Sequence, residues 1–230
     1  FKKIDAIMSK KVKFLKEKLP KNIWEDKISI IEPYLKEERG RIEGHSSLLL
    51  RPKSTHQVSE ILKICNKYNI KVVPQGGRTG LSGGTVPLKE KDQVVLSLER
   101  MDKVIKINKD KSCIFVQAGC KLEIIKKVAK KYNRFFPIEL ASKDRCTIGG
   151  NISTNAGGTA VLKYGMTRDL VLGLEVVLPN GTIIDGLREI KKDNRAYDLK
   201  QLFIGAEGSI GIITGAAIKV FPKIQSSVMA

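Results

Sequence analysis

Three glycine-rich segments constrain this chain more than any other feature, because they concentrate glycine where predicted strands end. They are VPQGGRTGLSGGT at residues 73–85, TIGGNISTNAGG at 147–158 and IGAEGSIGIIT at 204–214. Glycine carries no side chain, so another group can approach its backbone closely. A loop of this kind can also turn successive N–H groups inward and bind an anion. The sequence therefore predicts several backbone surfaces built for close approach.

Each segment has a simpler interpretation when it is taken alone. The first has neither the Gly-Lys-Ser/Thr spacing of a P-loop nor the GxGxxG fingerprint, so a plain glycine-rich turn explains it as well as an anion nest. The third fits a tight β-corner. The second is harder to explain as a surface loop, because buried backbone needs hydrogen-bond partners. Together the segments suggest a large, extended cofactor held mainly by backbone, with Thr79 and Ser82 as further hydroxyl donors.

Composition limits the class of protein. The chain has 230 residues, of which 42% are hydrophobic and 29% charged, which is typical of one large or two small globular domains. No apolar run is long enough to span a membrane. The net charge of +18 favours an anionic partner or substrate. Nucleic acid is not the expected partner, because the lysines are scattered and aromatic residues make up only 6%.

Cysteine and histidine usage excludes the common metal sites. The cysteines at 65, 113, 120 and 146 form no CxxC pair, and only two histidines are present, His45 and His56. A zinc or iron–sulfur site is therefore not expected. Unpaired cysteines fit a reducing compartment. The basic first 19 residues lack the apolar core of a secretory signal. A turn position is expected for His45 and a first helical turn for His56, both without a functional role.

Apolar spacing predicts a mixture of helices and strands, which indicates an α+β or α/β class. Helices are expected at 1–20, 54–68 and 121–132, the second capped by Ser54 or Thr55. Strands are expected at 47–51, 70–74, 93–98, 104–108, 113–118, 172–178, 182–184, 202–204, 210–214 and 217–221. Pro179-Asn180-Gly181 indicates a hairpin, and residues 147–159 show little periodicity.

Four ordered motifs resemble one known family. They are PQGGRTGLSGG from Pro74, FPIELASKDRCTIGGNISTNAGG from Phe136, YGMTRDLVLGLEVVLPNGTII from Tyr164 and KDNRAYDLKQLFIGAEGSIGIIT from Lys192. They resemble the PCMH-type FAD-binding domain of the vanillyl-alcohol oxidase / p-cresol methylhydroxylase superfamily. The match is closest to the branch of D-2-hydroxyglutarate, D-lactate and glycolate dehydrogenases. The resemblance implies an α+β fold in which two α/β subdomains with mixed sheets clasp FAD.

The resemblance also implies which residues contact the cofactor. The loop for the FAD pyrophosphate would comprise Pro74, Gln75, Gly76, Gly77, Arg78, Thr79, Gly80, Leu81, Gly83 and Gly84. Pro137 and Ser142 would lie along the cofactor, and Tyr164 would pack nearby. The flavin and ribityl region would be followed by Gly149, Gly150, Asn151, Thr154, Asn155, Ala156 and Gly157. The adenosine half would meet Glu207, Gly208, Ile212 and Ile213. Position 78 most often holds Asn in this branch, so the pose of Arg78 is an open point.

The implied domain plan has three parts. Residues 1–44 would be an N-terminal helical segment, 45–223 the FAD-binding domain and 224–230 the start of a cap domain that binds the substrate. In the family, the catalytic histidine and metal-binding histidines belong to that later region, and neither histidine of this chain matches them. No catalytic residue and no metal ligand is therefore assigned here. Arg78 or Arg168 could clamp a substrate carboxylate, whereas Tyr164 and Lys163 are poor candidates for the base.

The implied activity is oxidation of a small 2-hydroxy acid, with hydride passing from the substrate Cα to FAD. The electron acceptor would be a quinone or an electron-transfer flavoprotein. The cofactor is expected to be non-covalent, because the pyrophosphate loop contains no histidine. The expected location is the cytoplasm, or the mitochondrial matrix in a eukaryote, and a homodimer is compatible with the family. The alternatives are an alditol, lactone or aryl-alcohol oxidase of the same superfamily, or a flavin-binding subunit that is inactive alone.

Overall fold

The computed structural model describes residues 8–89, 92–108, 112–190 and 197–226. The helices are α1 Lys10–Lys18, α2 Ile28–Ile31, α3 Thr55–Lys67, α4 Leu122–Lys131, α5 Ile148–Ser153, α6 Val161–Tyr164, α7 Thr167–Leu170 and α8 Lys200–Phe203, with 3-10 turns at Lys21–Ile23 and Glu32–Tyr34. The strands are β1 Trp24–Glu25, β2 Leu49–Leu50, β3 Lys71–Gln75, β4 Gln93–Ser97, β5 Val104–Asn108, β6 Cys113–Gln117, β7 Arg134–Phe135, β8 Val171–Val177, β9 Ile183–Asp185, β10 Ile212–Lys219 and β11 Phe221–Pro222.

Within the described residues the strands form two main sheets. The first has the order β1-β2-β4-β3 and is mixed, because β2 and β3 run parallel to β4 whereas β1 is antiparallel to β2. The second has the order β5-β6-β10-β8-β9 and is antiparallel throughout these pairs. Strands β7 and β11 form a small separate ribbon. The α+β class expected from the sequence is confirmed.

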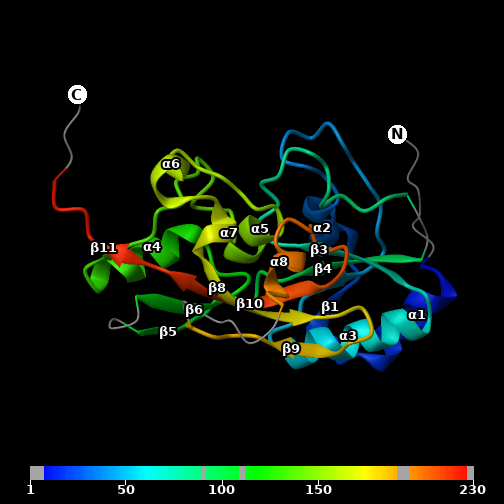
Figure 1. Ribbon diagram of the computed structural model, residues 1–230. Helices are drawn as coiled ribbons and strands as arrows, with labels where there is room; N and C mark the ends of the chain where they lie inside the picture. The colour runs from blue at the N-terminus through cyan, green and yellow to red at the C-terminus, as the bar shows by residue number, and fades with distance from the viewer. Residues whose placement is uncertain (1–7, 90–91, 109–111, 191–196, 227–230) are drawn as a thin grey trace.

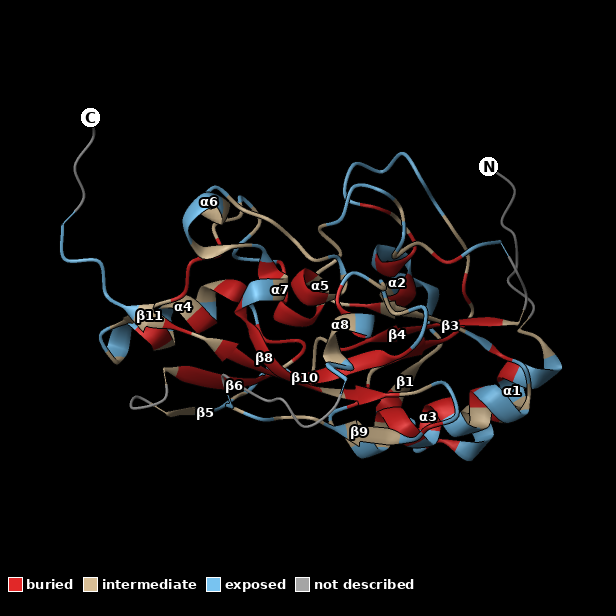
Figure 2. Ribbon diagram, in the orientation of Figure 1, coloured by how far each residue is buried: buried red, intermediate tan, exposed pale blue. Residues whose placement is uncertain are grey.

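The two sheets lie along the long axis of the molecule, with β11 at one end and α1 at the other (Figure 1). Helices α5, α7 and α8 lie together beside β8 and β10, on the opposite side of the molecule from α3 (Figure 1). The buried residues run continuously through both sheets and line the inner faces of these helices (Figure 2). One hydrophobic cluster joins Leu50 and Leu96 of the first sheet to Ile114 and Ala216 of the second. The sheets therefore share a core.

Helix α3 shows how local sequence determines an element. The Ser54 side chain caps the helix by accepting a hydrogen bond from the Gln57 backbone N–H at 3.3 Å. Val58, Ile61 and Cys65 follow at helical spacing and are buried. Strand β4 is different, because every residue from Gln93 to Ser97 is buried, as expected for a strand between two parallel neighbours. The apolar spacing thus identifies both elements.

Some expected elements differ from the structure. The strand expected at 202–204 is wrong, because α8 places Phe203 in the core and leaves Leu202 60% exposed. The strands expected at 210–214 and 217–221 are largely one strand, β10, in which a bulge near Gly215 shifts the register. The region 147–159 contains the helix α5. The first helix covers only Lys10–Lys18 of the expected 1–20, and residues 1–7 lie outside the described part of the chain.

The first 44 residues are not separate from the first sheet. Strand β1 pairs with β2 through Trp24 opposite Leu50 and Glu25 opposite Leu49. Val12 and Leu15 of α1 are fully buried in the shared core. The segment therefore supplies both an edge strand and core residues. No helix in the described parts of the chain is long and apolar enough to cross a membrane.

Candidate functional site

The three glycine-rich segments meet at one cleft. Strands β3 and β10 and helix α5 supply much of its wall. The lining residues are Pro74, Gln75, Gly76, Gly84, Thr85, Leu98, Ala118, Thr147, Gly149, Gly150, Ser153, Thr154, Glu207, Gly208, Ile212 and Ile213.

Because glycine has no side chain, the first segment can lie close to the other two. A Cβ on Gly76 would lie 2.3 Å from Thr147 Oγ1, and one on Gly208 would lie 2.4 Å from Pro74 Cγ. Both distances are too short for a real contact, so these positions require glycine if the walls are to keep their spacing. A Cβ on Gly149 would similarly meet Ala118 Cβ at 2.6 Å. The glycines therefore act first by letting their backbone lie directly against neighbouring side chains around the cleft.

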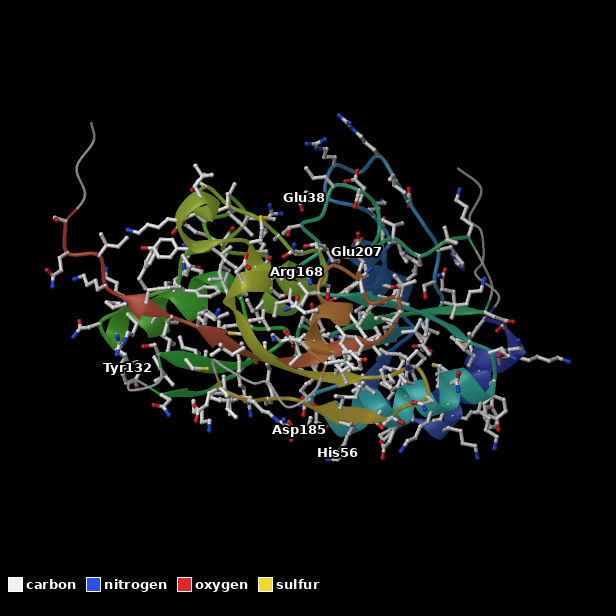
Figure 3. The ribbon with its side chains drawn as sticks, viewed as in Figure 1. Glu38, His56, Tyr132, Arg168, Asp185 and Glu207 are labelled. Carbon is white, nitrogen blue, oxygen red and sulfur yellow. The ribbon has the colours of Figure 1, made fainter. Side chains whose placement is uncertain are left out.

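Hydrogen bonds join the second and third segments. The Gly205 N–H donates to the Ile152 carbonyl oxygen at 3.1 Å, and the Glu207 N–H donates to the Ser153 carbonyl oxygen at 2.9 Å. Arg168 of α7 strengthens this junction, because its Nη2 donates to the Ile204 carbonyl oxygen at 2.8 Å and its Nη1 to the Gln201 carbonyl oxygen at 3.2 Å. Arg168 and Glu207 lie close together in the view of Figure 3. The Arg168 guanidinium therefore supports the wall of the cleft, whereas the sequence offered Arg168, or Arg78, as a possible clamp for a substrate carboxylate.

The backbone of the first segment has unused hydrogen-bond donors. Among the described residues, no acceptor is found for the backbone N–H groups from Gly76 to Thr85. Gly80, Leu81, Ser82 and Gly84 are exposed, so water can satisfy their N–H groups, whereas residues 76–79 are half-buried and their N–H groups require water or a ligand as partner. A run of such donors in a loop with little side-chain bulk is the arrangement that binds an anion. This observation favours the anion nest over the plain turn.

Two buried polar atoms at the cleft also lack a partner. Gln75 and Thr147 are 2% and 4% exposed, and within the described structure neither Gln75 Oε1 nor Thr147 Oγ1 has a hydrogen-bond partner. The Gln75 amide orientation is set, because its Nε2 donates to the carbonyl oxygens of Tyr34 and Thr85 at 2.8 and 2.6 Å. An unpartnered buried polar group is costly unless a ligand satisfies it. The donor and acceptor set of the cleft therefore fits a long polar ligand such as FAD.

The structure brings part of the expected site residues to this cleft. Those that line it are Pro74, Gln75, Gly76, Gly84, Gly149, Gly150, Thr154, Glu207, Gly208, Ile212 and Ile213. Those that do not line it are Gly77, Arg78, Thr79, Gly80, Leu81, Gly83, Pro137, Ser142, Asn151, Asn155, Ala156, Gly157 and Tyr164. Pro137, Ala156 and Gly157 instead border a small second hollow. The Tyr164 ring packs against Phe221 and Phe135, at centroid distances of 4.8 and 5.8 Å.

Sequence reasoning missed some of the cleft residues, among them Thr147, Ala118 and Leu98. Ala118 and Leu98 lie just beyond the ends of β6 and β4, where a strand end is a general signal for a site but does not select a residue. In the sequence, Thr147 is only the first residue of the second glycine-rich segment. Its side chain is identified by burial without a partner, which the sequence does not reveal.

The histidines and cysteines take no part in the cleft. His56 is exposed on α3, at the lower edge of Figure 3 and far from Glu207. All four cysteines are free and buried. Burial raises the pKa of the Cys65, Cys113 and Cys120 thiols to about 12, so they remain protonated near neutral pH. Among the described residues no group of three or more His, Cys, Asp or Glu could hold a metal ion.

Known proteins match this chain in both sequence and fold. A protein from Oryza sativa subsp. indica named probable D-2-hydroxyglutarate dehydrogenase, mitochondrial, is 47% identical over 90% of this chain and 36% of its own length. A protein from Danio rerio named D-2-hydroxyglutarate dehydrogenase, mitochondrial, is 48% identical over 77% of this chain and 33% of its own length. The chain thus spans about a third of the length of these relatives.

A solved structure of alkyldihydroxyacetonephosphate synthase shares the fold, with a TM-score of 0.82 at 24% identity over 94% of this chain and 41% of that chain. The sequence profile of the family described as FAD binding domain matches residues 46–186. This range contains the first two glycine-rich segments, and the third closes the same cleft. The chain therefore belongs to the family of FAD-binding domains.

Proposed function

We propose that this chain is the FAD-binding portion of a flavin-dependent 2-hydroxy-acid dehydrogenase of the D-2-hydroxyglutarate type. The proposal rests on one observation about the cleft. Backbone N–H groups of the first segment that have no acceptor in the described structure lie there together with the buried, unpartnered side-chain oxygens of Gln75 and Thr147. The names of the rice and zebrafish relatives support the substrate class. D-lactate and glycolate are the related substrates to compare.

Different residues of the cleft would contact different parts of FAD. Of the first segment, Gly76, Gly84 and Thr85 border the cleft, and their N–H groups would bind the pyrophosphate. Gln75 Oε1 and Thr147 Oγ1 would meet polar groups of the cofactor. The contacts at Gly149, Gly150 and Thr154 would follow the flavin and ribityl region. The remaining assignments made from the sequence, from Gly77 to Ile213, stay proposals. Bound FAD would supply an acceptor for the hydride that leaves the substrate Cα.

The residues of the cleft can bind and orient, but none of them is a histidine, and Glu207, the one carboxylate among them, is assigned to the adenosine half of FAD. Neither histidine borders the cleft, and Arg168 is engaged in supporting its wall. A base must lie within hydrogen-bond reach of the substrate hydroxyl. We therefore propose that the group that accepts the hydroxyl proton lies outside the cleft residues named here.

A second candidate function is a flavin-binding module that does not turn over substrate alone. The lack of a histidine among the residues of the cleft favours it. An oxidase for alditols, lactones or aryl alcohols is a weaker alternative, because the curated relatives reported above carry hydroxy-acid dehydrogenase names.

Partners and location follow as further proposals. The relatives named as mitochondrial support the mitochondrial matrix, with the cytoplasm as the alternative. The electron acceptor would be a quinone or an electron-transfer flavoprotein, and a homodimer is the proposed assembly. Co-purification with an electron-transfer flavoprotein and the mass in solution would test these two points separately.

The test uses the 230-residue chain in two steps. FAD titration, followed by quenching of flavin fluorescence, should show saturable binding that is much tighter than that of riboflavin. The FAD-loaded chain is then mixed without oxygen with D-2-hydroxyglutarate, D-lactate or glycolate. We expect no flavin bleaching by the chain alone. Bleaching with D-2-hydroxyglutarate is expected after fusion to the C-terminal region of the rice relative.

The outcomes separate the candidates. No FAD binding would refute the proposal. FAD binding without activity in the fusion would favour the module that only binds flavin. Bleaching by the chain alone would place the missing base within these residues.

A further inference from the structure

Arg78 has an unusual backbone conformation inside the first glycine-rich segment. Its φ is +57°, in the left-handed region that residues with long side chains rarely adopt. Such a conformation persists only where the surroundings fix the residue, and it is often found beside binding sites. The contacts of the Arg78 side chain therefore decide how this segment keeps its shape.

Two side chains hold the Arg78 guanidinium. Its Cζ lies 4.0 Å from the centroid of the Tyr34 ring, which is a cation–π geometry. Its Nη1 lies 3.7 Å from Glu99 Oε2. The side chains of Arg78 and Glu99 are 26% and 28% exposed, so solvent screens this pair only in part. Arg78 is thus held by one stacking contact and one ionic contact.

Tyr34 and Glu99 are themselves firmly placed. The Tyr34 hydroxyl donates to Glu99 Oε1 at 2.6 Å, and Arg51 Nη2 lies 2.7 Å from the same oxygen. Tyr34 is 8% exposed, and burial together with the hydrogen bond to Glu99 raises its pKa. The phenol therefore stays neutral and can donate at any physiological pH. Arg51 follows β2 and Glu99 follows β4, so the first sheet supports this cluster.

The same tyrosine also contacts the start of the segment. Gln75 Nε2 donates to the Tyr34 carbonyl oxygen at 2.8 Å and to the Thr85 carbonyl oxygen at 2.6 Å. The Gln75 amide thus connects both ends of residues 76–84 to Tyr34. Tyr34 lies before the region 46–186 that the family profile matches. The N-terminal segment therefore contacts the glycine-rich loop and its supports through three groups of Tyr34. The backbone carbonyl oxygen accepts from Gln75, the ring contacts Arg78, and the hydroxyl donates to Glu99.

We propose that Tyr34 and Glu99 form an anchor for Arg78 and thereby fix the first glycine-rich segment for the FAD pyrophosphate. Arg78 is then a positioning residue, because its guanidinium lies on the anchor and Arg78 does not line the cleft. This inference rests on the proposed function, since it takes the pyrophosphate as the ligand of the segment. It assigns a part of the cofactor site to the N-terminal segment.

The first test is FAD affinity in matched variants. Glu99→Gln and Tyr34→Leu should each weaken FAD binding about fivefold or more, because the unanchored arginine no longer holds the left-handed conformation. Arg78→Asn should keep the FAD affinity within about threefold, because Asn adopts that conformation without an anchor. When Glu99→Gln or Tyr34→Leu is added to the Arg78→Asn variant, the affinity should not change further. Glu43→Gln, which removes an exposed ion-pair partner of Lys36, is the control.

The second test needs no cofactor. Trypsin cleaves after arginine, so the rate of cleavage after Arg78 in the cofactor-free chain reports how often this residue leaves its anchor. Glu99→Gln and the milder Tyr34→Phe should raise that rate about threefold or more, while cleavage after exposed Arg39 stays unchanged. Melting temperatures measured alongside identify a variant that has lost its fold.

The results can overturn the proposal in distinct ways. A loss of FAD affinity above about tenfold in Arg78→Asn would make Arg78 a direct pyrophosphate ligand instead. If Glu99→Gln binds FAD as tightly as wild type or more tightly, Arg78 would likewise be a direct pyrophosphate ligand and not a positioning residue. If the wild-type chain binds no FAD, the proposed function fails, and the trypsin rates alone then decide whether the anchor exists.

Discussion

The backbone N–H of Glu207 donates to the carbonyl oxygen of Ser153 over 2.9 Å. Ser153 is the last residue of α5, and the carbonyl groups at the end of a helix have no partner within it. The third glycine-rich segment therefore caps the short helix of the second one. Glu207 has a φ of +51° to make this bond, and Gly205, with a φ of +84°, precedes it. The two segments form a single wall of the cleft.

This wall should be sensitive to the backbone at Gly205. The nearest atom to a Cβ there is 3.6 Å away, so Gly205→Ala would fit sterically and its cost would come from the left-handed conformation. We expect the free energy of unfolding to fall by about 1–2 kcal/mol. Glu207→Asn, which places a tolerant residue at a similar φ, should change it by less than about 0.5 kcal/mol. Urea unfolding of the cofactor-free chain measures both, and equal losses would contradict this explanation.

Two buried threonines should respond in opposite ways to the same change. Thr147 Oγ1 has no partner in the described structure, whereas Thr167 Oγ1 donates to the Ala156 carbonyl oxygen at 2.6 Å. Thr167→Val should lower the free energy of unfolding by about 1–2 kcal/mol. Thr147→Val should leave the cofactor-free chain as stable as wild type or more stable, yet reduce the rise in melting temperature caused by FAD. Thermal melts with and without FAD test the pair. An unchanged FAD effect in Thr147→Val would remove this hydroxyl from the site.

The buried thiols predict how stability depends on alkaline pH. Burial raises the pKa of Cys65 from 9.0 to about 12, so in the folded chain the thiol stays protonated where the unfolded chain ionises. The stabilising effect is complete below pH 9 and is lost as the pH rises toward 12. The urea midpoint of wild type should therefore fall more steeply above pH 9 than that of Cys65→Ala. Parallel pH profiles for the two chains would contradict the assignment.

FAD should leave the chain without cleavage of a covalent bond. Cys146 is the one cysteine next to the second segment, and it is buried with its Sγ 3.7 Å from Asn151 Nδ2. The first segment has no histidine or cysteine. Acid precipitation of the FAD-loaded chain should therefore release all the colour into the supernatant. A yellow pellet would show a covalent link, and Cys146→Ala would then identify its site.

The sequence predicted those elements whose signals are local. Ser54 and the spacing of Val58, Ile61 and Cys65 predict α3 almost to its ends. Helix α5 was not expected, because Gly149 and Gly150 interrupt its apolar spacing and it has only six residues. The tertiary pairing of β10 with β8, not its own sequence, makes it one strand across the bulge at Gly215.

The same distinction holds for the site. The glycine segments and their convergence were expected from composition and resemblance. The cluster of Tyr34, Arg51, Arg78 and Glu99 was not expected, because its members lie far apart in the sequence. Tyr34 and Glu99, which share a hydrogen bond, are 65 residues apart. Arg168 was one of two possible substrate clamps, but its guanidinium donates to backbone carbonyl oxygens of residues 201 and 204. Contacts of this kind depend on the assembled fold.

The place of β10 in the second sheet has a consequence for synthesis of the protein. This strand lies between β6 and β8, and Gly215 pairs with Gln117, about 100 residues earlier. Neither β6 nor β8 can complete its hydrogen bonds until β10 has left the ribosome. The half-built sheet then exposes unpaired strands whose residues are mostly buried in the finished fold, which favours aggregation and binding by chaperones. A nascent chain stalled before residue 212 should therefore depend on chaperones, whereas one released after residue 219 should not.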